Sequence, residues 1–519
     1  MNGTPLITLL TFLPVVGAIL VGLMPSTSVK PARVITLITS FVALLLTGIL
    51  WMAFDSKSGG MQFEETHDWI VDLGIQYHVA VDGLSLLMIL LVSLVVPLAL
   101  LSIRRAEEQT PAYYALILLL QAGLYGTFTT LNFFHWFIYW ELSIVPAFFL
   151  IKLWGGPGRN AAATQFFIYT MVGSVTMLLS FLALFWATRT FDFQKLTELA
   201  HNQELSNLIN TKLTGWSGLS RHQLPLLIFA GVFLGLAVKV PLVPFHTWLP
   251  NAYAEAPTST TMLLTGLMSK MGVYGFLRIL LPIFPDPMRE LMTPLLWLAV
   301  ATIVLSASAA FAQKDLKRML AYSSINHLGI CLLGVFAAAQ FTGKDSAWDN
   351  EKASVLNGVM LQMFNHGLTA SLLFCFVGFL EERSGGLRGL ESFGGLRKVA
   401  PVFCGLMGIS LFASLGLPGL NGFIGEFLIF KGAFPLVTWA TSLSVIGLLL
   451  TAIFLLTLVQ KVFNGPLNEK WSAMPDLTHR ERLLVIPFTV IFFLVGLNPE
   501  LLLGKLNATV MLWVEQLKF

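Results

Sequence analysis

Two lysines in one largely apolar stretch are the residues best placed to do chemistry. Residues 231–280 form two apolar segments joined by a turn-rich strip, and each segment carries one lysine, Lys239 or Lys270. A lysine cation in hydrocarbon costs several kcal/mol, so such a side chain is expected to face protein or water and to mark a function. The spacing therefore predicts a site that handles protons or ions.

The first of these segments is expected to be interrupted. Pro241 and Pro244 follow Lys239 closely, and each lacks an N–H and crowds the carbonyl one turn earlier. Carbonyls freed in this way must line a polar cavity or meet water. Because broken helices recur at the ion sites of transporters, we expect a broken helix beside Lys239.

Glu141 is the carboxylate best placed to complement Lys239. It lies about midway along the apolar segment 132–153. An isolated carboxylate there is expected to bind a proton, whereas a nearby ammonium would keep it ionised. Proton movement near one group then affects the other, so Glu141 and Lys239 are predicted to form a switchable proton site. A static ion pair that fixes helix packing is the structural alternative.

Lys270 is predicted to relay protons inside its own segment. It lies about ten residues, or ~15 Å, from either end of the span 259–281, which is too far for its side chain to reach an interface. Gly266, Gly272 and Gly275 surround it and allow water or a close helix approach. Snorkelling to an interface, the structural alternative, therefore fits poorly.

Histidines extend the candidate proton path. His327 and His366 each follow an asparagine within a membrane segment, and imidazole titrates near neutrality. Each could also be a buried histidine whose hydrogen bonds are satisfied. His246 follows the first break and fits either water access or turn structure. His246 and His366 are assigned to a secondary path.

Glu426 follows a second, glycine-rich break around Pro418. Irregular backbone at membrane depth is expected to be hydrated or covered by protein, so Glu426 is predicted to be the terminal acceptor before proton release. A first-turn acid that stabilises the restarted helix is the alternative.

Composition sets the class of protein. The chain has 519 residues, of which 56% are hydrophobic and only 11% are charged, which is outside the range of soluble domains. We expect an all-α polytopic membrane protein. A net charge of +3 does not indicate a nucleic-acid partner. The three cysteines lack metal-ligand spacing and no nucleotide-binding glycine loop is present, so no cofactor or metal is predicted in this chain.

Apolar runs of about twenty residues predict about fourteen transmembrane helices. They lie at 5–24, 34–53, 84–103, 112–130, 132–153, 163–188, 224–243, 259–281, 290–312, 317–338, 353–380, 401–429, 439–463 and 483–503. An even count places both termini on one side. Basic residues gather in one set of short loops, which the positive-inside rule places in the cytoplasm, so both termini are predicted to be non-cytoplasmic. Those residues are Lys30, Arg33, Arg104, Arg105, Lys152, Arg159, Lys314, Lys317, Arg318, Arg383, Arg388, Arg397 and Lys398.

The order of the helices indicates an internal repeat. Residues 112–281 and 282–463 are interpreted as two five-helix units whose fourth helix is interrupted, after N-terminal helices in 1–111 and before a last helix and tail in 464–519. An odd number of spans inverts the second unit relative to the first, as in many transporters.

Several motifs together resemble a known family. They are VKVPLVPFHTWLPNAYAEAPTS, LLTGLMSKMGVYGFLR, FAQKDLKRMLAYSSINHLG, QMFNHGLTASLLF and GLPGLNGFIGEF. The chain resembles the antiporter-like proton-channel subunits of respiratory complex I over nearly its whole length. WEL at 140–142, FHTWLP at 245–250 and glutamate at position 426 indicate one subunit type within that family.

The resemblance implies a central hydrophilic axis with His366 nearby. The axis residues are Glu141, Lys239, Lys270, His327 and Glu426. It also implies that FMN, iron–sulfur clusters and quinone belong to partner subunits, and that the neighbours include other antiporter-like membrane subunits in a bacterial inner membrane or an equivalent energy-transducing membrane. The strip 189–222 is longer than the resemblance predicts.

Other functions remain open at this point. The homologous chain of a multisubunit Na⁺/H⁺ antiporter has similar helices and lysines but usually carries lysine at the Glu426 position. The equivalent subunit of a hydrogenase or a ferredoxin-fed complex differs in partners that bind the electron donor. A purely structural membrane scaffold is a further class.

Overall fold

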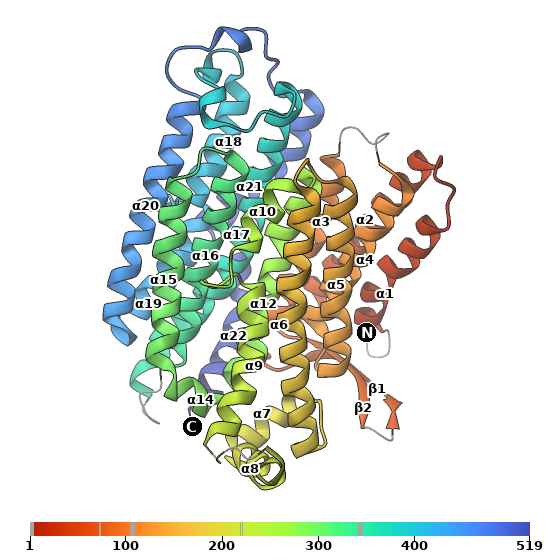
Figure 1. Ribbon diagram of the computed structural model, residues 1–519, viewed down its shortest axis with the longest axis vertical. Helices are drawn as coiled ribbons and strands as arrows, with labels where there is room; N and C mark the ends of the chain where they lie inside the picture. Colours follow the sequence, from red (N-terminus) through yellow and green to blue (C-terminus); the bar gives the residue numbers. More distant parts are fainter. Residues whose placement is uncertain are drawn as a thin grey trace.

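The computed structural model describes residues 5–71, 74–103, 109–217, 220, 222–340 and 346–518. Arg104 and Arg105, two of the basic loop residues, lie outside the described residues. The chain forms a bundle of long helices that run roughly along one axis (Figure 1).

Ten helices in the described ranges are long and apolar enough to cross a membrane, and a bent pair makes an eleventh candidate. The chain is therefore a mostly helical, polytopic membrane protein, as predicted. The ten are α2 (Val29–Ala53), α3 (Gly83–Leu101), α4 (Pro111–Thr129), α5 (Phe133–Trp154), α6 (Arg159–Thr188), the segment Thr258–Ile283, α15 (Met292–Phe311), α16 (Leu316–Ala338), α17 (Asp349–Ser384) with the short turn before it, and α20 (Thr438–Val462).

The bent pair and the shorter helices complete the bundle. The pair is α21 (His479–Leu497) and α22 (Glu500–Gln516), which meet at 60°. The shorter helices are α1 (Leu6–Gly22), α7 (Phe193–His201), α8 (Glu204–Ser217), α9 (Gln223–Lys239), α10 (Trp248–Glu255), α14 (Pro285–Glu290), α18 (Pro401–Ser414) and α19 (Asn421–Leu436). The stretch after residue 503, predicted only as a tail, is thus largely helical.

Both predicted helix breaks are present. α9 ends at Lys239 and the chain becomes helical again only at Trp248, because Pro241 and Pro244 cannot continue the helix. α18 ends at Ser414 and α19 begins at Asn421. Gly416 and Gly419 in the second break have φ of 78° and 92°, which glycine adopts without steric cost.

The strip 55–82 contains a β-hairpin, which the all-α prediction missed. β1 (Gln62–Ile70) pairs antiparallel with β2 (Ile75–Val81), and Thr66 lies opposite His78. The second strand, IQYHVAV, is rich in β-branched and aromatic residues that favour strands. The hairpin lies at the lower end of the bundle, below the N-terminal helices (Figure 1).

A histidine ties this hairpin to α7. His78 Nδ1 lies 2.7 Å from Asp192 Oδ2 and its Nε2 lies 2.7 Å from Glu64 Oε1. Burial opposes the imidazolium, but the hydrogen bonds to the two carboxylates outweigh burial and raise the pKa of His78 above its ordinary value. Burial likewise opposes the Asp192 carboxylate, but its hydrogen bonds from His78 and the Lys195 amide lower the pKa of Asp192.

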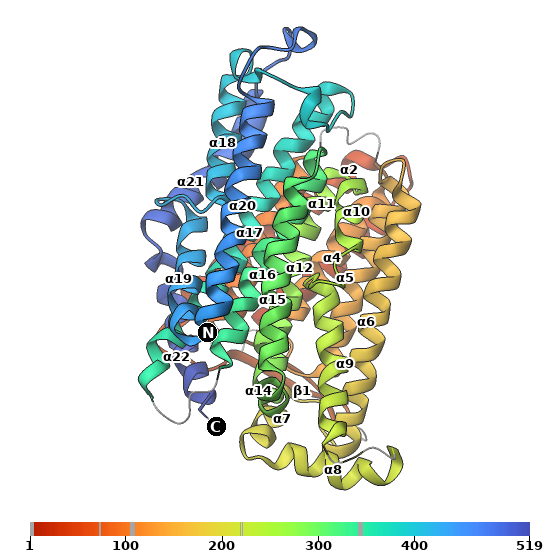
Figure 2. The same ribbon diagram turned by 60° about the vertical axis from the view of Figure 1, so that its left-hand side comes forward.

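The middle of the bundle is formed by α16, α17 and the segment Thr258–Ile283. Nearly all of their residues are buried, whereas α2 and α20 leave large apolar side chains on the outside. Figure 2 shows α12 (Ser269–Gly275) and α16 behind α15 and α20. Polar side chains on the middle helices are therefore shielded from lipid.

Two π-helical segments flank Lys270, which the sequence did not predict. They are η3 (Leu264–Met268) and η4 (Phe276–Leu280), and α11 (Thr258–Leu263), α12 and α13 (Leu281–Ile283) complete the span. Such π segments shift the backbone hydrogen-bond ladder by one residue and often occur at functional sites.

Candidate functional site

Four titratable side chains form a connected series in the middle of the bundle. Lys270 Nζ lies 2.8 Å from His366 Nδ1. The ring centres of His366 and His327 are 5.0 Å apart. His327 Nδ1 lies 2.8 Å from Glu426 Oε1. We call Lys270, His366, His327 and Glu426 the central series.

Lys270 is held by the backbone of its own helix. Its side chain is 0% exposed. Its ammonium donates to the Thr265 carbonyl at 2.6 Å and to the Ser269 hydroxyl at 3.4 Å. Thr265 lies in the π-helical segment η3, one π turn before Lys270. The irregular helix thus supplies the acceptors that a buried ammonium needs.

His366 has a more central position than the sequence indicates. The sequence assigns it to a secondary path, yet its ring lies between Lys270 and His327. Gln362, one helical turn earlier on α17, donates to Glu426 Oε1 at 3.1 Å. The i, i+4 spacing of two polar residues on an apolar helix is the signal that could have indicated a shared face.

Glu426 faces His327 rather than the start of its own helix. It lies beyond the first turn of α19, which begins at Asn421. His327 Nε2 contacts the Ser414 hydroxyl at 3.3 Å, at the last residue of α18. The break therefore brings the end of α18 and the second turn of α19 against the same histidine.

Asparagines form hydrogen bonds between helices that fix the axial positions of the helices carrying the central series. The Asn365 amide donates to the Asn421 carbonyl at 2.7 Å, and the Asn421 amide donates to the Thr369 hydroxyl at 3.3 Å. The Asn326 amide donates to the Thr451 hydroxyl at 2.6 Å. Two of these asparagines precede the histidines in the sequence, and their role here is to position helices.

Glu141 and Lys239 lie near each other without direct contact. Lys239 is 1% exposed, its Nζ donates to the Ser143 hydroxyl at 3.3 Å, and it lies 4.8 Å from the centre of the Trp140 ring. Glu141 interacts with Lys239 electrostatically. No ion pair within 4.0 Å joins the two in the described part of the chain. Trp140 thus stabilises the ammonium by a cation–π contact.

The two lysines belong to separate groups of contacts. Among the described residues, no hydrogen bond joins Lys239 to Lys270. Their helices approach closely where Gly272 meets Val240, since a Cβ on Gly272 would lie 2.9 Å from the Val240 nitrogen. Proton transfer between the two lysines therefore has no direct contact to follow in this conformation.

His246 lies in the first break, away from the central series. Its ring centre is 6.4 Å from that of Tyr322. Its Nδ1 is buried and has no hydrogen-bond partner among the described residues. Within those residues, no group of three or more His, Cys, Asp or Glu is arranged to hold a metal ion.

Comparisons with known proteins identify relatives over nearly the whole chain. The family described as NADH:quinone oxidoreductase/Mrp antiporter, transmembrane, matches residues 130–453. NADH-quinone oxidoreductase subunit M of Rickettsia bellii is 33% identical over 513 residues, covering 98% of both chains. F(420)H(2) dehydrogenase subunit M of Methanosarcina mazei is 36% identical over 472 residues, covering 89% of this chain and 88% of the relative.

A solved structure has the same fold. A chain of respiratory complex I from Thermus thermophilus with bound NADH superposes with a TM-score of 0.83 at 27% identity, covering 98% of this chain and 99% of the other.

Proposed function

The chain belongs to the NADH:quinone oxidoreductase/Mrp antiporter transmembrane family, and on that premise we propose that its central series carries protons across the membrane. It is a proton-translocating membrane subunit of NADH:quinone oxidoreductase, of the subunit M type. The family resemblance predicted from the sequence motifs is thereby confirmed.

The observation that carries the proposal is the series of short distances that leads from Lys270 through His366 and His327 to Glu426. The Lys270 ammonium passes a proton to the facing Nδ1 of His366, which lies 2.8 Å away. A proton released from the other side of that ring passes to His327, and His327 Nδ1 faces Glu426 Oε1 at 2.8 Å. Imidazole suits this role because it can take a proton on one nitrogen and release one from the other.

Glu141 and Lys239 act as the switch. A carboxylate and an ammonium about 4 Å apart attract each other by ~4 kcal/mol at an effective dielectric constant of ~20, which corresponds to nearly a thousandfold in a proton equilibrium. Approach of Glu141 to Lys239 retains the proton on the lysine, and withdrawal favours its release toward Lys270. The Ser143 contact of Lys239 supports the withdrawn arrangement as the one in this structure.

The finer topology belongs to the same proposal. Adding α1, α9 and the broken pair α18–α19 to the eleven candidate spans gives about fourteen crossings. Residues 112–281 and 282–463 then form two inverted five-helix repeats between the N-terminal helices of 1–111 and the C-terminal helices of 464–519. Both termini are placed outside the cytoplasm, in a bacterial inner membrane or an equivalent energy-transducing membrane, with the basic loops inside.

Partner subunits supply the redox chemistry. FMN, iron–sulfur clusters and quinone are assigned to them, and this chain contacts neighbouring antiporter-like subunits and the bilayer. The relative from an F(420)H(2) dehydrogenase is 36% identical, which supports a second candidate, the same subunit in a complex with another electron donor. Because the donor binds elsewhere, the two candidates are distinguished by the chains that co-purify with this one.

Replacement of Lys239 by alanine in the assembled complex tests the function. We expect proton pumping by reconstituted vesicles to fall strongly while NADH oxidation with an artificial acceptor continues. Unchanged pumping in an assembled complex would instead support a structural scaffold. Turnover that requires sodium would support the antiporter alternative.

A further inference from the structure

A cavity of about 460 Å³ opens at the end of the bundle that carries the basic loops. Its wall includes Glu381 near the end of α17, Thr258 and Ser259 at the start of α11, and Tyr113 on α4. α17 also carries His366, and the span that begins with α11 carries Lys270. The cavity therefore lies at the outer ends of the two helices that begin the central series.

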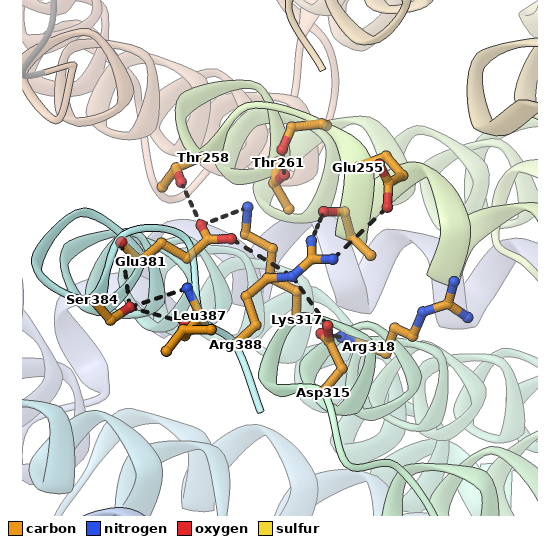
Figure 3. Close-up of polar contacts among 12 residues, drawn as sticks. Glu255, Thr258, Thr261, Asp315, Lys317, Arg318, Glu381, Ser384, Leu387 and Arg388 are labelled. Carbon is orange, nitrogen blue, oxygen red and sulfur yellow. Dashed lines mark hydrogen bonds and ion pairs between the residues drawn. The ribbon is translucent and has the colours of Figure 1, made fainter. Parts of the chain in front are cut away.

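Glu381 is anchored at this cavity by groups from three directions (Figure 3). Its Oε2 lies 2.8 Å from Lys317 Nζ and accepts from the Thr258 hydroxyl at 3.5 Å. Its Oε1 lies 3.8 Å from Arg388 Nε. The Glu381 side chain is 17% exposed, so the carboxylate is fixed in place and still reached by water.

Other charged groups surround Glu381 on every side. Arg388 is shared, because its Nε lies 3.1 Å from Asp315 Oδ2 and its Nη2 lies 3.8 Å from Glu255 Oε1 (Figure 3). Glu382 lines the same cavity and Arg318 lies at the margin of the cluster. Lys317 is thus the nearer of the two cations within 4.0 Å of Glu381 among the described residues, and Glu382 is a second carboxylate on the cavity wall.

Hydroxyl groups lead from the cavity toward Lys270. The Tyr113 hydroxyl lies 2.6 Å from Ser259 Oγ and 3.2 Å from Thr260 Oγ1. Further along the helix, Thr265 Oγ1 lies 3.0 Å from the Ser324 hydroxyl, within one π turn of Lys270.

The distance between the two groups of hydroxyls is short. Eleven residues of helix span ~16 Å between Ser259 and Lys270. Thr261, between the two groups of hydroxyls, is also buried, and its hydroxyl donates to the Tyr253 carbonyl at 3.0 Å. A hydroxyl can donate and accept at the same time, so buried hydroxyls in series can pass a proton where apolar side chains cannot.

We propose that Glu381 collects protons at the mouth of a route that supplies Lys270. The inference rests on the proposed proton-carrying function of the central series. A proton from water binds the carboxylate and weakens its attraction to Lys317. The same proton leaves toward the hydroxyls of Ser259 and Tyr113, and Glu381 returns to its ionised form, so one proton enters and one is passed on.

A nearby carboxylate provides a matched control. Asp315 belongs to the same ionic cluster and pairs with Arg388, but it does not line the cavity. It also caps α16 by accepting from the Arg318 amide at 3.0 Å, and asparagine caps helices as well as aspartate. Asp315→Asn therefore removes one charge from the cluster without changing the cavity wall.

The test compares Glu381→Gln, Glu381→Asp and Asp315→Asn in the full complex reconstituted in vesicles. Proton pumping is measured against the pH on the side of the basic loops. Glu381→Gln is expected to slow pumping about a hundredfold at neutral and alkaline pH, the low end of what a positioned acid–base group contributes. Lower pH or added formate should restore its rate, and the other two variants should behave like the wild type.

Four results test the inference. Wild-type pumping by Glu381→Gln overturns the inference, as does an equal loss in Glu381→Gln and Asp315→Asn that formate does not restore, because that pattern is structural. If Glu381→Gln does not assemble, Tyr113→Phe decides: slowed pumping supports the route and unchanged pumping refutes it. Lys270→Ala distinguishes failure of this inference from failure of the proposed function, since unchanged pumping by Lys270→Ala would refute the proposed function itself.

Discussion

Replacement of Gly425 by alanine should disturb proton transfer through one steric contact. Gly425 lies where α19 crosses α17, and a Cβ there would lie 2.6 Å from Gln362 Oε1 and 2.9 Å from the Gln362 nitrogen. The nitrogen is backbone and cannot rotate away, so the helices must separate. Gln362 also donates to Glu426, so the disturbance reaches the central series directly.

The size of the effect follows from these distances. An ordinary contact begins at 3.4 Å, so the backbone of α17 and α19 must part by about 0.5 Å. If α16, which carries His327, keeps its position relative to α17, the 2.8 Å distance between His327 Nδ1 and Glu426 Oε1 increases by a similar amount, to the limit of a hydrogen bond. Overpacking costs about 1–3 kcal/mol, and the gain of about 1 kcal/mol from replacing a helical glycine offsets part of it.

Proton pumping and thermal stability of the reconstituted complex should therefore be measured for Gly425→Ala beside Gly408→Ala. A Cβ on Gly408 meets no atom within 4 Å, so the control should pump like the wild type. We expect Gly425→Ala to assemble, to lose at most ~2 kcal/mol of stability and to pump several-fold more slowly. Wild-type pumping and stability in Gly425→Ala would refute the packing argument.

Three further outcomes are expected. His366→Leu should lower pumping as strongly as His327→Leu, and a clearly milder loss would remove His366 from the central series. The raised pKa of His78 stabilises the hairpin fully below its unfolded pKa of about 6.5, and this contribution is lost as pH rises through the higher folded pKa. Hydrogen-exchange protection factors in β2, which are corrected for the base-catalysed intrinsic rate, should therefore fall at alkaline pH in the wild type and change little with pH in His78→Gln. Arg383→Met removes the 2.6 Å ion pair between Arg383 and the buried Glu481 carboxylate, which keeps its hydrogen bonds from Thr478. It should destabilise the subunit by about 3 kcal/mol in thermal denaturation, whereas the exposed-site control Glu391→Gln should not.

The sequence predicted the features that depend on local chemistry. The prolines after Lys239 and the glycines around Pro418 predicted both helix breaks, because backbone restrictions act within a few residues. The family was also predictable, because its motifs are local strings of residues.

Features that depend on packing between distant segments were not predictable. The position of His366 between Lys270 and His327 requires three helices to meet, and no local pattern specifies that. The separation of Glu141 from Lys239 depends on how α5 and α9 pack, and Ser143 rather than the carboxylate receives the ammonium. The π segments around Lys270 likewise reflect tertiary packing more than local propensity.

The most direct test of the central claim is the number of protons pumped per electron by the complex carrying Glu426→Gln. Glutamine keeps the shape of Glu426 and can still accept hydrogen bonds, but it cannot bind and release a proton at this position. We predict a lower proton-to-electron ratio, or the loss of coupled turnover, in a fully assembled complex. An unchanged ratio at wild-type turnover would contradict proton transfer through Lys270, His366, His327 and Glu426.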